Sequence, residues 1–149
     1  MSFFANADVT VSGSMERAFA ELSDFRSWKA FMPPEFTPMR GPSRILKSGD
    51  RVHVKLDTGM LMLPAVIQIL WVRAPKEIAW SGGNALLRAE HRFYFETTES
   101  GETRIRSEEE WTGALSHVGA LARRIKRQAE IIGSAQLHGL ATHLKALSS

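Results

Sequence analysis

The fold is decided by the stretch from Leu87 to Gly113, which reads LRAEHRFYFETTESGETRIRSEEEWTG. Apolar and polar side chains alternate on both sides of the polar turn 99–102, as expected of two β-strands with one face on a core. On the first strand His91 falls among the apolar positions, and on the second Ser107 and Glu109 fall between Ile105 and Trp111. The stretch therefore predicts a long β-hairpin whose inner face carries polar groups.

His91 and Glu109 are the main candidates for chemistry, because a charged group on a core face is costly unless it is paired or solvated. If Thr97 lies opposite Thr103, then His91 lies opposite Glu109, and such cross-strand neighbours are about 5 Å apart. The pair has three interpretations: a structural pair that fixes the strand register, a polar anchor for a ligand, or an acid/base catalyst.

The segment before the hairpin predicts one strand, two short helices and further strands. Residues 3–12 alternate as a strand, and Ser14 and Asp24 are good N-caps for a helix that begins at Met15 and for a second helix over 25–31. The Pro- and Gly-rich residues 32–49 predict an irregular loop, interrupted by a short strand around 44–47. Further strands are predicted at 51–57, 61–72 and 77–81. Pro64 should lie at an edge position or a bulge.

Residues 116–147 form the one long helical pattern, with apolar or small residues at three- and four-residue steps. Gly119, Gly133 and Gly139 interrupt it, which indicates either close approach to the sheet or room for a ligand. An antiparallel sheet with an apolar face needs a cover, and this helix is the element long enough to supply it. The order predicts an α+β fold in which a curved antiparallel sheet of six to seven strands wraps around the C-terminal helix.

The clearest motif of the chain begins at Trp80 and consists of Trp80, Gly82, Glu90-His91-x-Phe93, Thr103-Arg104, Glu109, Trp111 and Gly113. With this motif, almost the whole chain resembles the START-like (SRPBCC) superfamily with the helix-grip fold, and within it a bacterial polyketide cyclase/dehydrase-like subgroup. The resemblance implies a single domain over 1–149. Three positions depart from the subgroup pattern: Ala89 replaces a glycine, Ser107 a histidine and Trp111 a phenylalanine. The lost histidine weakens any mechanism that needs a histidine pair.

The preferred function is binding of a hydrophobic or amphipathic small molecule in a cavity between the sheet and the last helix. His91, Ser107 and Glu109 would supply its polar contacts. One alternative is a cyclase- or dehydrase-type enzyme with His91 as acid/base, and another is a non-catalytic interaction protein; a homodimer is left open. The apolar wall would consist of Phe31, Trp80, Phe93, Phe95, Trp111, Ile125, Ile132 and Leu140.

Composition and motifs argue against several other classes of protein function. The chain has no cysteine and a net charge of +3. It shows no zinc, nucleotide or flavin signature, so we expect no metal and no cofactor. We also expect a cytoplasmic protein with no nucleic-acid partner, no signal peptide and no membrane span. The basic cluster 123–127 is explained by a solvated helix face, although it can also favour an acidic surface.

Overall fold

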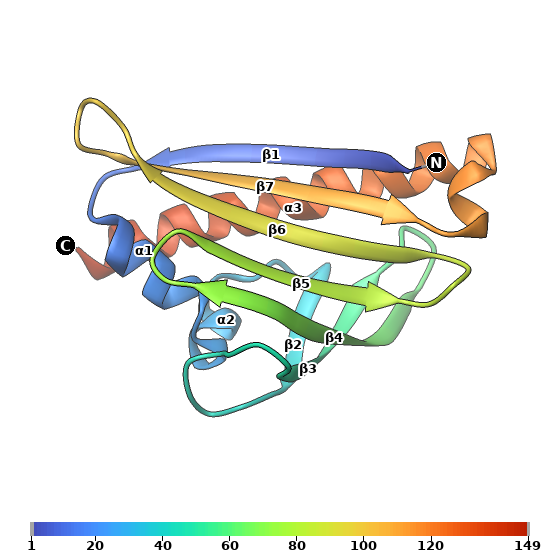
Figure 1. The fold of residues 1–149 in the computed structure, drawn as a ribbon, viewed down its shortest axis with the longest axis horizontal. Helices are drawn as coiled ribbons and strands as arrows, with labels where there is room; N and C mark the ends of the chain where they lie inside the picture. The colour runs from blue at the N-terminus through green and yellow to red at the C-terminus, as the bar shows by residue number, and fades with distance from the viewer. Residues whose placement is uncertain (1, 149) are drawn as a thin grey trace.

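The computed structural model describes residues 2–148 and contains one antiparallel sheet and one long helix (Figure 1). The strands run in the spatial order β1-β7-β6-β5-β4-β3-β2, so sequence neighbours pair except where β1 closes against β7. The elements are β1 (Phe3–Val11), α1 (Met15–Leu22), α2 (Phe25–Phe31), β2 (Phe36–Arg40), β3 (Arg51–Asp57), β4 (Met62–Arg73), β5 (Glu77–Gly83), β6 (Arg88–Thr97), β7 (Thr103–Thr112), the 3-10 turn η1 (Ala114–His117) and α3 (Gly119–Leu147).

The predicted hairpin is confirmed as β6 and β7, and its register is the predicted one. Thr97 pairs with Thr103 and His91 pairs with Glu109. The turn is closed by hydrogen bonds from the Thr98 and Gly101 amides to the Glu102 and Thr98 carbonyls. Because side chains alternate along a strand, this register fixes which side chains of both strands face α3.

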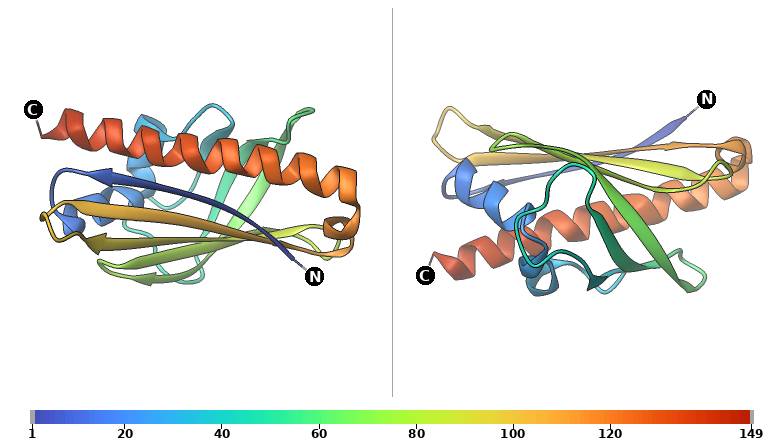
Figure 2. Two further views of the ribbon diagram at one scale, coloured as in Figure 1. Left: turned by 90° about the horizontal axis from the view of Figure 1, so that it is seen from above. Right: turned by 60° about the horizontal axis from the view of Figure 1, so that its bottom comes forward.

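Both predicted helix caps are present. The Ser14 hydroxyl accepts a hydrogen bond from the Arg17 amide at 3.1 Å, and the Asp24 carboxylate accepts one from the Arg26 amide at 3.0 Å. Each cap satisfies an amide that has no partner within its helix. The two helices form an elbow beside the C-terminal half of α3 (Figure 2).

The strand predicted at 44–47 is wrong, because the loop instead supplies β2 at Phe36–Arg40, at the edge of the sheet. Pro38 obscured this strand in the sequence, but an edge strand tolerates proline because its outer N–H needs no partner. Ile45 forms only an isolated bridge to Asp24. Pro64 lies at an edge position, as predicted. It pairs with Lys55 of β3, and this part of β4 has no partner in β5.

The long helix covers the inner face of the sheet, with β1 along its flank (Figure 2). It begins at Gly119, after η1, so the prediction of a helix from 116 was three residues early. A Cβ atom at Gly139 would collide with the Phe31 carbonyl, so this glycine lets α3 approach the end of α2. A Cβ at Gly133 would lie 3.6 Å from Ser107 Oγ, which places this part of α3 directly against β7.

Candidate functional site

The two predicted polar residues of the hairpin do lie together inside the fold. His91 is buried, and its Nδ1 atom lies 3.5 Å from Glu109 Oε1. The other ring nitrogen, Nε2, is hydrogen-bonded to Ser107 Oγ at 2.6 Å. The imidazole is packed between aromatic rings, with centroid distances of 5.3 Å to Trp80 and 4.1 Å to Phe93. Both nitrogens of His91 are thus engaged by residues of β7.

Burial determines the charge state of both His91 and Glu109. It lowers the pKa of His91 from 6.5 to about 3, and it raises the pKa of Glu109 from 4.5 to about 8. The cause is the same in both cases, since removal from water disfavours the charged form. At neutral pH the imidazole is therefore uncharged, and Glu109 is a carboxylic acid that can donate as well as accept a hydrogen bond.

These pKa values predict that stability is greatest between about pH 4.5 and 6.5. Above that range both His91 and Glu109 are deprotonated in the unfolded chain, whereas Glu109 in the folded protein stays protonated up to about pH 8. The folded state then binds more protons, and rising pH costs about 1–2 kcal/mol. Below pH 4.5 both groups are protonated in the unfolded chain, whereas His91 in the folded protein stays neutral down to about pH 3. Falling pH therefore lowers the free energy of unfolding by a similar amount, about 1–2 kcal/mol.

Urea unfolding of the wild type and of Glu109→Gln across this pH range checks the prediction. The glutamine variant should lose the alkaline decline and keep the acid one, since glutamine does not titrate. An unchanged alkaline decline in Glu109→Gln would assign that decline to other groups.

Gln136 is a polar residue of the interior that was not among the candidate site residues predicted from the sequence. Its side chain is 2% exposed, and neither its oxygen nor its nitrogen is hydrogen-bonded to any described residue. It lies one helical turn beyond Gly133, which packs against Ser107. The indole N–H of Trp111, two residues beyond Glu109 on the same face of β7, is also buried without a hydrogen-bond partner. A glutamine in an apolar stripe was the available sequence signal.

The predicted wall residues divide into two groups. Two of them, Trp111 and Ile125, are only partly buried, as is Glu109 with a side chain 12% exposed. The others lie in the closed core, and these are Phe31, Trp80, Phe93, Phe95, Ile132 and Leu140.

Exposure of inward-facing side chains rises toward the end of the molecule where α3 begins. On β3 and β4 the buried Val52 and Ile67 pair with each other, whereas nearer the hairpin tip Leu56 is partly exposed and its partner Leu63 is exposed. On α3 the same stripe runs from buried Ile132 to half-buried Ile125 and Leu121. We call this region the open end of the inner face, and it consists of Leu56, Leu63, Ala89, Trp111, Leu121 and Ile125.

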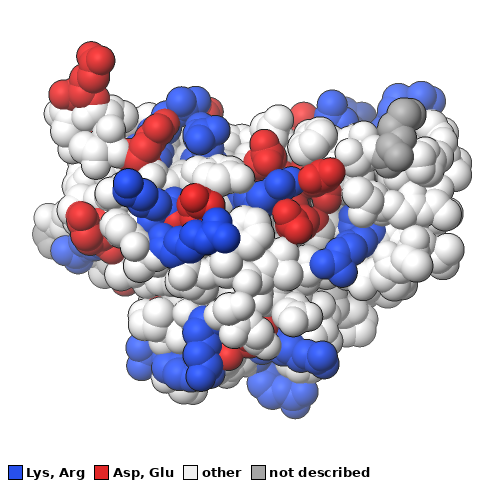
Figure 3. Space-filling view, in the orientation of Figure 1, with Lys and Arg blue, Asp and Glu red and all other residues white. Residues whose placement is uncertain are grey.

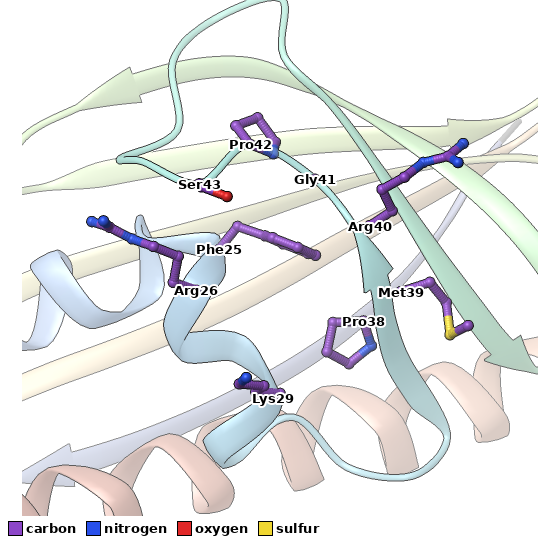
Figure 4. Close-up of a pocket in the computed structure, with 9 residues that line it drawn as sticks. All are labelled: Phe25, Arg26, Lys29, Pro38, Met39, Arg40, Gly41, Pro42 and Ser43. Atoms are coloured by element: carbon purple, nitrogen blue, oxygen red, sulfur yellow. The ribbon is translucent and has the colours of Figure 1, made fainter.

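Two surface cavities are formed by the described residues, and His91 lines neither of them. One, of about 350 Å³, lies between α2 and β2, where Phe25 faces Gly41 (Figure 4). The other, of about 400 Å³, lies mainly over outward-facing residues of β1, β6 and β7, with Ser107 also in its lining. Around His91 the interior is occupied by rings, since Trp80 also contacts Trp28 and Phe93 with centroids 5.0 and 4.8 Å apart.

Three other histidines make their contacts away from the His91–Glu109 pair. His143 Nε2 is 2.6 Å from Glu21 Oε1, which ties α3 to α1. His138 bonds within its own helix to Ser134, and His53 lies 3.5 Å from an Arg40 guanidinium nitrogen. Among residues 2–148, no group of three or more His, Asp or Glu side chains could hold a metal ion. No helix in this part of the chain could cross a membrane.

Solved structures share this architecture over nearly the whole chain. TTHA0849 from Thermus thermophilus is 16% identical, with a TM-score of 0.78 over 98% of this chain and 99% of that one. The Zhui aromatase/cyclase from Streptomyces sp. R1128 is 10% identical, with a TM-score of 0.75 over 100% and 97%. Norcoclaurine synthase from Thalictrum flavum, solved with dopamine and hydroxybenzaldehyde, is 10% identical, with a TM-score of 0.74 over 100% and 90%.

These likenesses confirm the fold expected from the sequence: the chain has the helix-grip fold, in which a curved antiparallel sheet holds a long C-terminal helix. No family model and no curated protein sequence matches the chain. The fold is one that small-molecule-binding proteins and cyclases use, and identities of 10–16% establish the fold alone.

Proposed function

We propose that this protein binds a small amphipathic molecule at the open end of the inner face, with its polar group toward Glu109 and Trp111. The observation that carries the proposal is the rise in exposure along that face. Apolar side chains that point inward, yet remain accessible, offer a ligand a surface that burial would stabilise by roughly 25 cal/mol per Å².

The polar groups at the inner limit of this surface favour a ligand with an acceptor oxygen. Burial keeps Glu109 protonated at neutral pH, so that its O–H can donate. The Trp111 indole N–H is a donor without a partner among the described residues. A carbonyl, hydroxyl or carboxylate oxygen could accept from both. An unsatisfied buried donor costs about 1–3 kcal/mol, which a ligand oxygen would recover.

The solved neighbours support the same chemical class. Norcoclaurine synthase holds dopamine and hydroxybenzaldehyde, which are small aromatic molecules with oxygen substituents. An apolar ring with an oxygen at one end would suit Leu63, Leu121 and Ile125 on the apolar side and Glu109 on the polar side.

The enzymatic alternative, with His91 as acid/base, has less support from the geometry. A catalytic base must come within hydrogen-bond reach of the proton it moves. Both His91 nitrogens face residues of β7, and the side chain is 4% exposed. Catalysis by His91 would need Ser107 or Glu109 to move aside, and the role stays a prediction.

Binding of anilinonaphthalenesulfonate, an amphipathic aromatic probe with acceptor oxygens, tests the proposal by fluorescence titration. Ile125→Trp should fill the open end and weaken probe binding by about tenfold or more, because it removes the apolar surface that the ring would cover. Ile131→Trp is the matched control, since Ile131 is exposed on α3 and should accept the larger ring with little effect.

Native mass spectrometry of the purified protein supplies an independent measurement, because a co-purified small molecule would appear as an added mass. Equal probe affinity for wild type and Ile125→Trp, together with no added mass, would exclude the open end as the binding site.

A further inference from the structure

The tip of the β3–β4 hairpin carries four consecutive exposed apolar residues. Met60, Leu61, Met62 and Leu63 are 65%, 54%, 45% and 46% exposed. A run of this kind is unfavourable in water unless another surface covers it. We call these four residues the apolar tip. The tip projects past α3 at the end where the helix begins (Figure 2).

The tip is held against the helix. The Gln128 side-chain amide donates a hydrogen bond to the Asp57 carbonyl at 3.1 Å, at the point where β3 enters the turn. Gly59 in the same turn also lies close to this side chain, because a Cβ atom there would be 3.5 Å from Gln128 Oε1. The apolar tip therefore has a defined place beside the first half of α3.

Cations surround this contact. Arg124 and Arg127 are exposed, one turn before and one residue before Gln128. Lys55 is exposed on β3 opposite Pro64, at the base of the tip. Apolar and cationic side chains therefore meet at this end of the molecule, with Arg124 and Arg127 on α3 and Lys55 on the outer face of β3. Figure 3 shows the opposite side of the molecule, the outer face of the sheet, where Lys and Arg are interspersed with Asp and Glu.

Two neighbouring carboxylates offset part of this positive charge. Asp57 is half-buried, and its Oδ1 atom accepts the Gly59 amide at 2.8 Å within the turn. Glu130 is the acidic residue of α3, and it follows Gln128 by two positions. At about 100° per residue, Glu130 lies on the same face of α3 as Arg127, three residues earlier, and offsets part of its charge, whereas Arg124 shares the face of Gln128.

We propose that this surface docks on an anionic lipid membrane, with the apolar tip inserted between headgroups and Lys55, Arg124 and Arg127 at the phosphates. A lipid surface fits both properties, since binding at an interface grows with apolar area and with attraction of cations to anionic lipids. A second copy of the chain fits less well, because a symmetric contact through this patch would bring its cations together. The apolar tip shares Leu63 with the open end, but membrane docking does not depend on a ligand bound there.

Vesicle co-sedimentation tests the proposal, using phosphatidylcholine vesicles with and without phosphatidylserine. We expect the full chain to bind the vesicles that contain phosphatidylserine, and binding to weaken as salt is added. Leu61→Ser/Arg124→Gln should bind about tenfold or more weakly, because it removes one apolar anchor and one cation. Lys145→Gln/Leu147→Ser makes the same types of change at the other end of α3, and it should bind as the wild type does.

Circular dichroism of all three proteins checks that a loss of vesicle binding is not caused by unfolding. We expect both variants to stay folded, because the altered side chains are exposed. No binding to phosphatidylserine vesicles by the wild type would overturn the proposal, as would equal losses in the two double variants. Dimerisation that depends on Leu61 and Arg124, without vesicle binding, would assign the patch to a second copy of the chain instead.

Discussion

Replacing Trp28 by alanine is expected to lower the free energy of unfolding by about 3–5 kcal/mol, the usual range for a large aromatic residue removed from a core. Trp28 is 0% exposed and contacts three rings, with centroid distances of 5.3 Å to Phe25, 6.0 Å to Phe36 and 5.0 Å to Trp80. Its indole N–H donates to the Leu22 carbonyl at 2.8 Å, which joins α2 to the end of α1.

Trp28→Phe separates packing from hydrogen bonding in this effect. Phenylalanine keeps most of the ring contacts but leaves the Leu22 carbonyl without its donor, so we expect a smaller loss of about 1–2 kcal/mol. Phe4→Ala is the surface control, because Phe4 is exposed on β1 and its loss should cost less than about 1 kcal/mol. Urea unfolding followed by circular dichroism measures all three. A loss in Trp28→Ala no larger than that of Phe4→Ala would show that this aromatic cluster does not anchor the two helices.

The fold could be predicted because its main signals are local in the sequence. Alternation along residues 87–111 and the polar turn at 99–102 specify the hairpin, and a one-residue slip would have turned His91 and Phe93 outward. Ser14 and Asp24 mark the helix starts through backbone chemistry that depends on adjacent residues. The strand β2 was missed because Pro38 is a breaker in most strands, and its tolerance depends on an edge position that the sequence does not display.

The site was less predictable, because side-chain contacts depend on rotamers and on packing across the sheet. The sequence analysis placed Glu109 opposite His91, and the structure agrees. The hydrogen bond of His91, however, goes to Ser107, two residues along β7 from the directly opposed position. Ser107 had been noted mainly as a lost histidine. A cavity was expected between the sheet and the last helix, with His91 among its polar contacts, and the sequence could not reveal that Trp80 and Phe93 pack directly on the imidazole ring.

Replacing His91 by alanine is expected to cost about 2–4 kcal/mol of stability while changing the affinity for anilinonaphthalenesulfonate only a few-fold. The ring packs against Trp80 and Phe93, so its removal leaves a void. It also engages Ser107 and Glu109, and both side chains lose this polar partner. The probe would contact Glu109 and Trp111 and reach His91 only through Glu109, so affinity should depend on His91 indirectly.

Ser107→Ala distinguishes a positioning role of His91 from direct contact with a ligand. It removes the hydroxyl at Nε2 and keeps the ring, so we expect a loss of about 1–3 kcal/mol with affinity near that of the wild type. Unfolding in urea and probe titration on the same samples give both quantities. If His91→Ala kept its stability and lost probe binding by more than about tenfold, the imidazole itself would contact the ligand. Ser107 and Glu109 would then orient a reactive base, and the acid/base alternative would become the better account of this site.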